Sequence, residues 1–169
     1  EELLRIRSGA KASKAAGRIA AEGVIGLYVA PGAKTAAMVE VNCETDFVAK
    51  NDDFRAFAAE IAQIVARENP PDLSALGAKS LASGEAIEAR RAVLVQKIGE
   101  NMSIRRFTRK SAAGRLASYV HGNRIGVLVD LTGGQLGRGA AGNRPGAAFV
   151  FADGEERHVA EQIVAGADH

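Results

Sequence analysis

The sequence predicts an α+β fold in which helices pack on an antiparallel sheet. Short runs of β-branched and other apolar residues, separated by turn signals, are typical of strands joined in hairpins. Longer segments between these runs repeat their apolar residues every three or four positions, which indicates amphipathic helices. With 169 residues, of which 47% are hydrophobic but only 5% aromatic, the chain can bury a core of aliphatic side chains. Helices between two groups of hairpin strands imply the α+β class.

The first two expected strands form a hairpin. Residues 24–29 and 36–41 are rich in β-branched side chains, and a Pro-Gly pair between them favours a turn. The second run leads into a polar cluster that should end the strand. Thr45 or Asp46 is expected to cap the helix that follows, because both side chains can accept a hydrogen bond from the first helical turn.

Two amphipathic helices are expected in the middle of the chain. The first spans residues 52–66, and an Asn-Pro-Pro sequence ends it shortly afterwards. A polar connection leads to the second helix, residues 86–98. Its side chains expected to face inward are Ile87, Val93, Leu94 and Ile98. Gly99 is the expected C-terminal cap, since glycine readily adopts the left-handed conformation that ends many helices.

Three further strands are expected at residues 102–108, 115–121 and 125–131. The last two are separated by Gly122 and Asn123, residue types that favour a tight hairpin turn. Along the chain, the two helices therefore separate two groups of antiparallel strands, an order that favours the α+β class.

The two ends of the chain differ from this central region. The first seven residues resemble the last turns of a helix that begins earlier, so an N-terminal truncation is expected. Six glycines crowd residues 133–147, which predicts a flexible loop because glycine is costly to order. A short strand at residues 149–151 and a short helix at residues 159–164 are expected beyond it.

Charge and cysteine content argue against several classes of function. Lys and Arg number 22 against 20 Asp and Glu, and a net charge of +2 is too small to indicate nucleic-acid binding. The single cysteine cannot form an internal disulfide, and no run approaches the roughly 18 apolar residues of a membrane span. Nothing in the given sequence suggests secretion. A cytoplasmic protein without membrane association is expected.

The sequence offers little support for enzyme chemistry. The three histidines are scattered and none has metal-ligand spacing, so no metal or other cofactor is expected. Cys43 and His121 could form a nucleophile and its base, but a lone cysteine near a strand end is more often a buried apolar residue.

A local basic patch raises a second alternative, an RNA-associated or ribosome-associated structural module. Its members, which surround Phe107, are Arg105, Arg106, Arg109 and Lys110. Without a wider basic surface, a solvated strand edge is the favoured interpretation of this patch.

The most informative segment is residues 40–51, where a carboxylate and a bulky aromatic follow each other at the start of a helix. From spacing alone, the favoured interpretation is that Phe47 belongs to the core and that Asp46 only caps the helix. The alternative is that Phe47 projects outward, where it would be available to another molecule.

At these residues the chain closely resembles elongation factor Ts, whose signature matches residues 41–50, Val-Asn-Cys-Glu-Thr-Asp-Phe-Val-Ala-Lys. The other matching segments are residues 8–11, 20–25, 97–101, 118–122 and 124–129. The resemblance covers residues 1–132. It implies that residues 1–20 are the end of an N-terminal helical, UBA-like module with its linker, that residues 21–132 are the first half of the family's core domain, and that residues 133–169 form a glycine-rich loop and a divergent tail.

The resemblance also implies a function. Elongation factor Ts is a guanine-nucleotide exchange factor that promotes GDP release from elongation factor Tu by protein contact, and it makes and breaks no covalent bond. The expected partner is therefore elongation factor Tu, both GDP-bound and nucleotide-free, and self-association as a homodimer is an open alternative. Residues implied to face the partner are Thr45, Asp46, Phe47, Ile98, Gly99 and His121, with Phe47 as a wedge.

Overall fold

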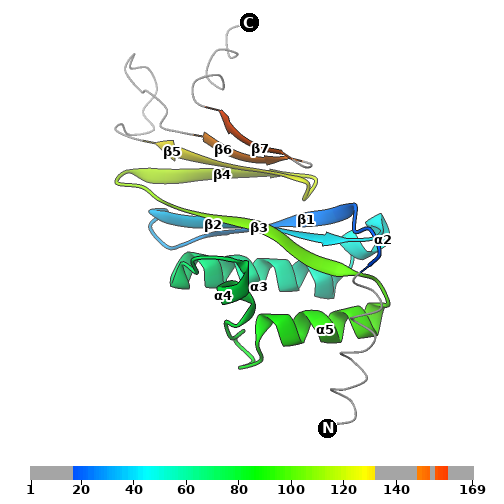
Figure 1. The fold of residues 1–169 in the computed structure, drawn as a ribbon. Helices are drawn as coiled ribbons and strands as arrows, with labels where there is room; N and C mark the ends of the chain where they lie inside the picture. The colour runs from blue at the N-terminus through cyan, green and yellow to red at the C-terminus, as the bar shows by residue number, and fades with distance from the viewer. Residues whose placement is uncertain (1–16, 132–147, 153–154, 160–169) are drawn as a thin grey trace, which may run out of the picture.

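The computed structural model describes residues 17–131, 148–152 and 155–159, which form three layers (Figure 1). Helices form the bottom layer in this view, a three-stranded sheet the middle layer, and a four-stranded sheet the top layer. All strand pairs are antiparallel. The α+β prediction is confirmed, with the strands divided between two stacked sheets.

The middle sheet has the order β1-β2-β3. Strand β1 (Glu22–Val29) and strand β2 (Thr35–Cys43) form the expected hairpin, and β3 (Met102–Ser111) pairs with the other edge of β2. Almost every residue of β2 is buried, because helices cover one face of the strand and the second sheet covers the other. Residues Val39 and Val41 face the helices, whereas Met38 faces the second sheet.

Two helices follow the central strand β2 in the chain. Helix α2 (Asp46–Ala49) has Thr45 as its N-cap, and helix α3 (Asp52–Glu68) is capped by Asn51, whose side chain accepts a hydrogen bond from the Phe54 amide at 3.1 Å. The apolar side of α3 packs on the middle sheet and supplies much of the main core. Its buried side chains include Phe54, Phe57, Ile61, Ile64 and Val65, all expected from the periodicity.

The second expected helix is α5 (Ile87–Ile98), which ends at Gly99 with a φ of 88°, so the predicted cap is confirmed. One inward position was wrong, since Val93 is 39% exposed and Val95, two residues later, is buried. The connection between α3 and α5 also contains a short helix, α4 (Leu73–Gly77), that the sequence analysis missed.

The second sheet has the order β4-β5-β6-β7. Strands β4 (Arg115–His121) and β5 (Ile125–Leu131) lie where expected, and Gly122 and Asn123 between them have φ values of 57° and 59°. Two such residues form the turn whose twist suits a hairpin. Leu116 and Leu128 bury their side chains against β1 and β2, which joins the two sheets.

Strand β6 (Ala148–Ala152) contains the short strand expected in the C-terminal region, and β7 (Glu155–Val159) pairs with it. The expected helix at residues 159–164 lies almost wholly outside the described residues. So do the first residues of the chain and the glycine-rich segment 133–147.

Candidate partner-binding site

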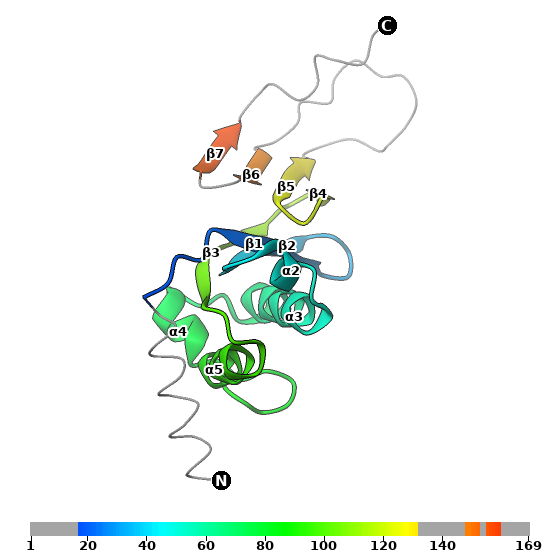
Figure 2. The ribbon, with the colours of Figure 1, turned by 90° about the vertical axis from the view of Figure 1, so that its right-hand side faces the viewer.

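Three segments that the family resemblance implies to face a partner lie at the same end of the molecule (Figure 1). Helix α2, the C-terminal end of α5 and the β4–β5 turn are all on the right in Figure 1. Figure 2 views this end directly and shows the three segments toward the viewer, with the β4–β5 turn above α2 and α5 below it. These segments carry Phe47, Ile98 with Gly99, and His121, respectively.

Phe47 is an exposed aromatic at the beginning of α2, with 80% of its surface accessible. The next two residues, Val48 and Ala49, are buried in the main core and occupy the inward positions of this four-residue helix. The interpretation from spacing, which put Phe47 in the core, is therefore wrong. A helix of one turn has room for only one inward side, and Val48 and Ala49 fill it.

The turn before α2 is hydrogen-bonded to the turn after α5. Glu100 accepts two backbone N–H bonds at Oε2, from Glu44 at 3.2 Å and from Thr45 at 3.1 Å. The Thr45 hydroxyl donates to Glu100 Oε1 at 2.7 Å and accepts a bond from the Val48 amide at 3.4 Å. In return, Glu44 accepts a bond from the Asn101 amide. We call these four residues, Glu44, Thr45, Glu100 and Asn101, the carboxylate clasp.

Arg18 connects the clasp to the start of the described chain. Its guanidinium pairs with Glu44 at 3.1 Å and donates to the Gly99 carbonyl at 2.8 Å. The Arg18 carbonyl accepts a hydrogen bond from the Asn101 side chain at 2.7 Å. The contacts of Arg18, Glu44, Glu100 and Asn101 were not predicted from the sequence. The signal available was that three of them lie inside the segments that carry the family resemblance.

The carboxylate of Asp46 points to solvent beside Phe47. Lys50, one helical turn later, donates to Asp46 Oδ2 at 2.7 Å, and this hydrogen bond holds the pKa of Asp46 below its ordinary value. Asp46 is ionised at neutral pH, and its carboxylate lies next to Phe47 in the sequence as one half of an ion pair with Lys50.

His121 is the last residue of β4 and is exposed. The Tyr119 hydroxyl lies 3.0 Å from His121 Nδ1, and the two rings stack with their centroids 6.2 Å apart. The turn that follows is attached to the middle sheet, because the Asn123 carbonyl accepts a bond from the Ile25 amide at 2.7 Å and Arg124 pairs with Glu22. His121 therefore has a defined position relative to β1.

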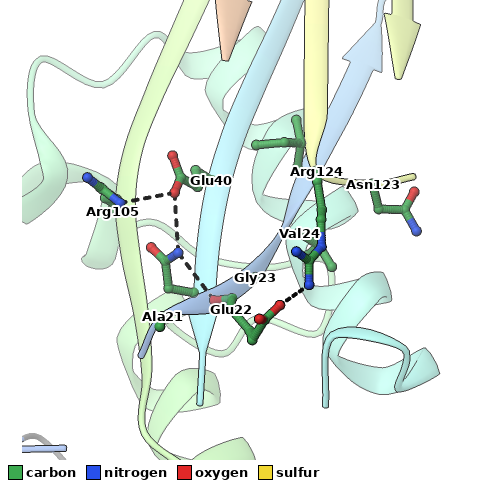
Figure 3. A pocket seen from close by; sticks show the side chains of 10 residues that line it. Ala21, Glu22, Gly23, Val24, Glu40, Arg105, Asn123 and Arg124 are labelled. Atoms are coloured by element: carbon green, nitrogen blue, oxygen red, sulfur yellow. Dashed lines mark hydrogen bonds and ion pairs between the residues drawn. The ribbon is translucent and has the colours of Figure 1, made fainter. Parts of the chain in front are cut away.

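A cavity of about 320 Å³ lies beside this turn and is lined by residues of β1, β2 and β3 together with Asn123 and Arg124 (Figure 3). Figure 3 shows Arg105 directed toward Glu40 and Arg124 toward Glu22. The buried Glu40 also accepts a hydrogen bond from Arg106 at 2.6 Å.

The basic patch is engaged within the protein. Glu40 pairs with Arg105 and Arg106, and Arg109 donates to the Ala66 carbonyl at 2.8 Å. Lys110, the fourth member of the patch, is likewise not without a partner. The arrangement favours a strand edge over an RNA-binding surface, which needs basic groups directed at phosphates.

Cys43 is unsuited to nucleophilic chemistry. It is fully buried in the main core, and burial, followed by the charges of Glu100 and Glu22, raises its pKa to about 12. The reactive form of cysteine is the thiolate, which is absent at neutral pH with such a pKa. This argues against the thiol-enzyme alternative.

Among residues 17–131, 148–152 and 155–159, no group of three His, Cys, Asp or Glu side chains could hold a metal ion. Over the same described parts of the chain, we find no helix with the length and apolar character needed to cross a membrane.

Comparison with known proteins agrees with the resemblance to elongation factor Ts. The family model described as Elongation factor TS matches residues 44–166. A relative from Bordetella petrii named Elongation factor Ts is 51% identical over 177 residues, covering 98% of this chain and 60% of the relative. Proteins of the same name from Aromatoleum aromaticum and Azoarcus sp. are 58% and 59% identical over 135 residues, covering 79% of this chain and 45% of each relative.

The chain thus spans about half the length of the curated relatives it matches. The family match and the Bordetella petrii alignment both extend beyond residue 132, so the similarity continues further toward the C-terminus than the sequence analysis expected. The chain belongs to the elongation factor Ts family.

Proposed function

We propose that this chain acts as a guanine-nucleotide exchange factor that promotes GDP release from elongation factor Tu. The observation that carries the proposal is the exposure of Phe47, an aromatic 80% accessible on a short helix whose neighbouring residues are buried. An apolar ring in water favours association, since burying a phenylalanine contributes about 1.5–3 kcal/mol. Family membership supports this choice of partner.

The proposed mechanism is a competition between protein contact and nucleotide. Phe47 enters between helices of the partner and displaces the backbone that organises magnesium and phosphate. Because the coupling between two ligands is reciprocal, the exchange factor weakens GDP binding as much as GDP weakens binding of the exchange factor. Typical coupling is about 1–3 kcal/mol, which corresponds to roughly 5-fold to 150-fold in affinity. No covalent bond is made or broken, so the protein is not an enzyme in the chemical sense.

The other expected contact residues have different proposed roles. Asp46 contributes a negative charge beside the ring, and Ile98 and Gly99 contribute the end of α5. His121 is proposed to lie near the phosphate side of the nucleotide site. Thr45 is proposed to act by positioning, because its hydroxyl already bonds Glu100 and the Val48 amide.

The chain's share of its relatives' length affects the expected activity. Since the chain spans about half the length of these relatives, we propose that it has residual exchange activity, weaker than that of a longer family member. We propose that it acts in the cytoplasm, on both GDP-bound and nucleotide-free elongation factor Tu. Formation of a homodimer stays a prediction.

The test is stopped-flow release of a fluorescent GDP analogue from elongation factor Tu. A buried aromatic hot spot contributes about 2 kcal/mol or more, so Phe47→Ala should lower the acceleration at low concentrations of this chain by roughly 30-fold. The matched control is Leu73→Ala, which removes another exposed apolar side chain, 42% accessible, from a helix outside the proposed surface. This control should retain the wild-type acceleration.

Both variants should keep the wild-type unfolding temperature, because exposed side chains contribute within about 0.5 kcal/mol to stability. The proposal fails if folded wild-type chain does not accelerate release. The proposed wedge role of Phe47 fails if the Phe47→Ala variant is as active as the wild type.

A further inference from the structure

We propose that Glu100 is a positioning residue for the exchange reaction, which fixes the orientation of Phe47 through Thr45. This inference rests on the proposed function above. It concerns a side chain that lies behind the proposed contact surface and acts through a neighbour.

The position of Glu100 follows from the end of α5. Gly99 adopts the left-handed conformation and its amide bonds the Val95 carbonyl at 2.8 Å, so the chain turns sharply at the last helical residues. The next side chain, that of Glu100, then meets the turn between β2 and α2. Its carboxylate accepts three hydrogen bonds there, two from the backbone amides of Glu44 and Thr45 and one from the Thr45 hydroxyl.

These bonds determine which way the Thr45 hydroxyl points. A hydroxyl has one hydrogen, and in this structure it is donated to Glu100 Oε1 at 2.7 Å. An oxygen lone pair is consequently left to accept the Val48 amide, which caps α2. The carboxylate therefore supports the N-cap of the helix on which Phe47 is the second residue.

Helix α2 depends on such support because it is short. It has four residues, and a single helical turn is not stable by itself in water. Only Val48 and Ala49 anchor it in the core. Without the carboxylate, the direction of Phe47 would be less restricted, and the partner would have to order it on binding at a cost in affinity.

The same contacts join the two proposed contact segments. Glu100 follows directly after Ile98 and Gly99 in sequence, and its bonds reach the residues immediately before Asp46 and Phe47. Glu44 returns a bond to the Asn101 amide, so each turn carries a carboxylate that binds the other. We infer that the clasp presents both segments as one preorganised surface.

The test is a double-mutant cycle with Glu100→Gln and Phe47→Ala, measured as the slope of GDP-analogue release rate against concentration of this chain. Glutamine has the size of glutamate but loses the charge and one acceptor oxygen, which weakens charge-assisted bonds. Glu100→Gln should lower the slope about 10-fold in the wild-type background and less than about 2-fold in the Phe47→Ala background, because only an interacting pair is non-additive. In the Phe47→Ala background, higher concentrations of this chain are used so that the slope stays measurable.

The matched control is Glu60→Gln, since Glu60 also accepts a backbone amide bond, from Ala82 at 2.8 Å, in another part of the structure. Its slope should equal the wild-type slope. If Glu100→Gln does not fold, as judged by circular dichroism, Glu100→Asp replaces it in the same cycle. That variant keeps the charge but shortens the reach, and the same non-additivity is expected.

The outcomes separate this inference from the proposed function. A wild-type chain that does not accelerate release overturns both. An active wild type with an equally active Glu100→Gln variant overturns the positioning role alone. Equal losses in both backgrounds would show that Glu100 acts independently of Phe47, which also overturns it.

Discussion

Replacing Gly26 with alanine tests the close approach of β1 to α3, on which the orientation of the helical layer depends. A Cβ atom at this position would lie 2.3 Å from the Ala58 carbonyl oxygen and 2.6 Å from its carbon. Ordinary contacts between such atoms are longer, so strand and helix would have to separate by about 1 Å. Both obstructing atoms belong to the backbone of α3, and no side-chain rotation can relieve the overlap.

The expected cost follows from this geometry. Overpacking a core costs about 1–3 kcal/mol, and a clash with rigid backbone should lie at the upper end, near 3 kcal/mol. For a chain of this size, 1 kcal/mol shifts the unfolding temperature by roughly 2–4 °C. Gly26→Ala should therefore unfold about 6–12 °C below the wild type.

The measurement is unfolding by heat and by urea, followed by circular dichroism. Gly77→Ala is the matched control, since the nearest atom to its new Cβ would be the Glu88 Cβ at 3.7 Å, an ordinary contact. Alanine there should raise stability by about 0.4–1 kcal/mol, because it restricts the unfolded chain. If Gly26→Ala and Gly77→Ala unfold at the same temperature, β1 and α3 do not approach each other as closely as described.

Two further predictions concern the helix cap and the buried thiol. Asn51→Ala should lower the free energy of unfolding in urea by about 1 kcal/mol, because the Phe54 amide loses its acceptor, whereas Asn51→Asp should stay near the wild type. Cys43 should resist a thiol reagent at pH 8 until the chain is unfolded in guanidinium chloride. Its raised pKa stabilises the fold fully below the unfolded thiol pKa of about 8.5, and this contribution decreases as pH rises toward 12. The stability difference between wild type and Cys43→Ala should therefore shrink between pH 8 and pH 10, and a constant difference would contradict this account.

Most of the secondary structure could be predicted because its signals are local. The apolar spacing of α3, the glycine cap of α5 and the Gly122-Asn123 turn each depend on residues within a few positions of one another. Helix α4 was missed since it has five residues and only Leu76 buried, too short a segment to show a period. The stacking of two sheets was also not predictable, because the contact of Leu116 and Leu128 with Met38 joins distant parts of the chain.

The candidate site likewise combines a residue that the sequence indicated with contacts between distant segments that it did not. The resemblance pointed to Phe47 as a partner-facing residue, whereas spacing alone put it inside the core, because a four-residue helix contains too few positions to define a face. The clasp could not be inferred from local patterns, since Glu44 and Thr45 are 56 and 55 positions from Glu100. Only the fold brings these turns together.

The clasp explains how an exposed aromatic can have a defined direction without contributing to the core. Phe47 makes little use of its apolar surface within the chain, whereas Val48 and Ala49 next to it are buried. Stability and the proposed activity therefore depend on different side chains of one short helix. A substitution at Phe47 should change the exchange rate without changing the unfolding temperature, whereas a substitution in the core should change both. A substitution at Glu100 should change the exchange rate only when Phe47 is present. This three-way separation would not arise if the end of the molecule were only a solvated edge of the fold.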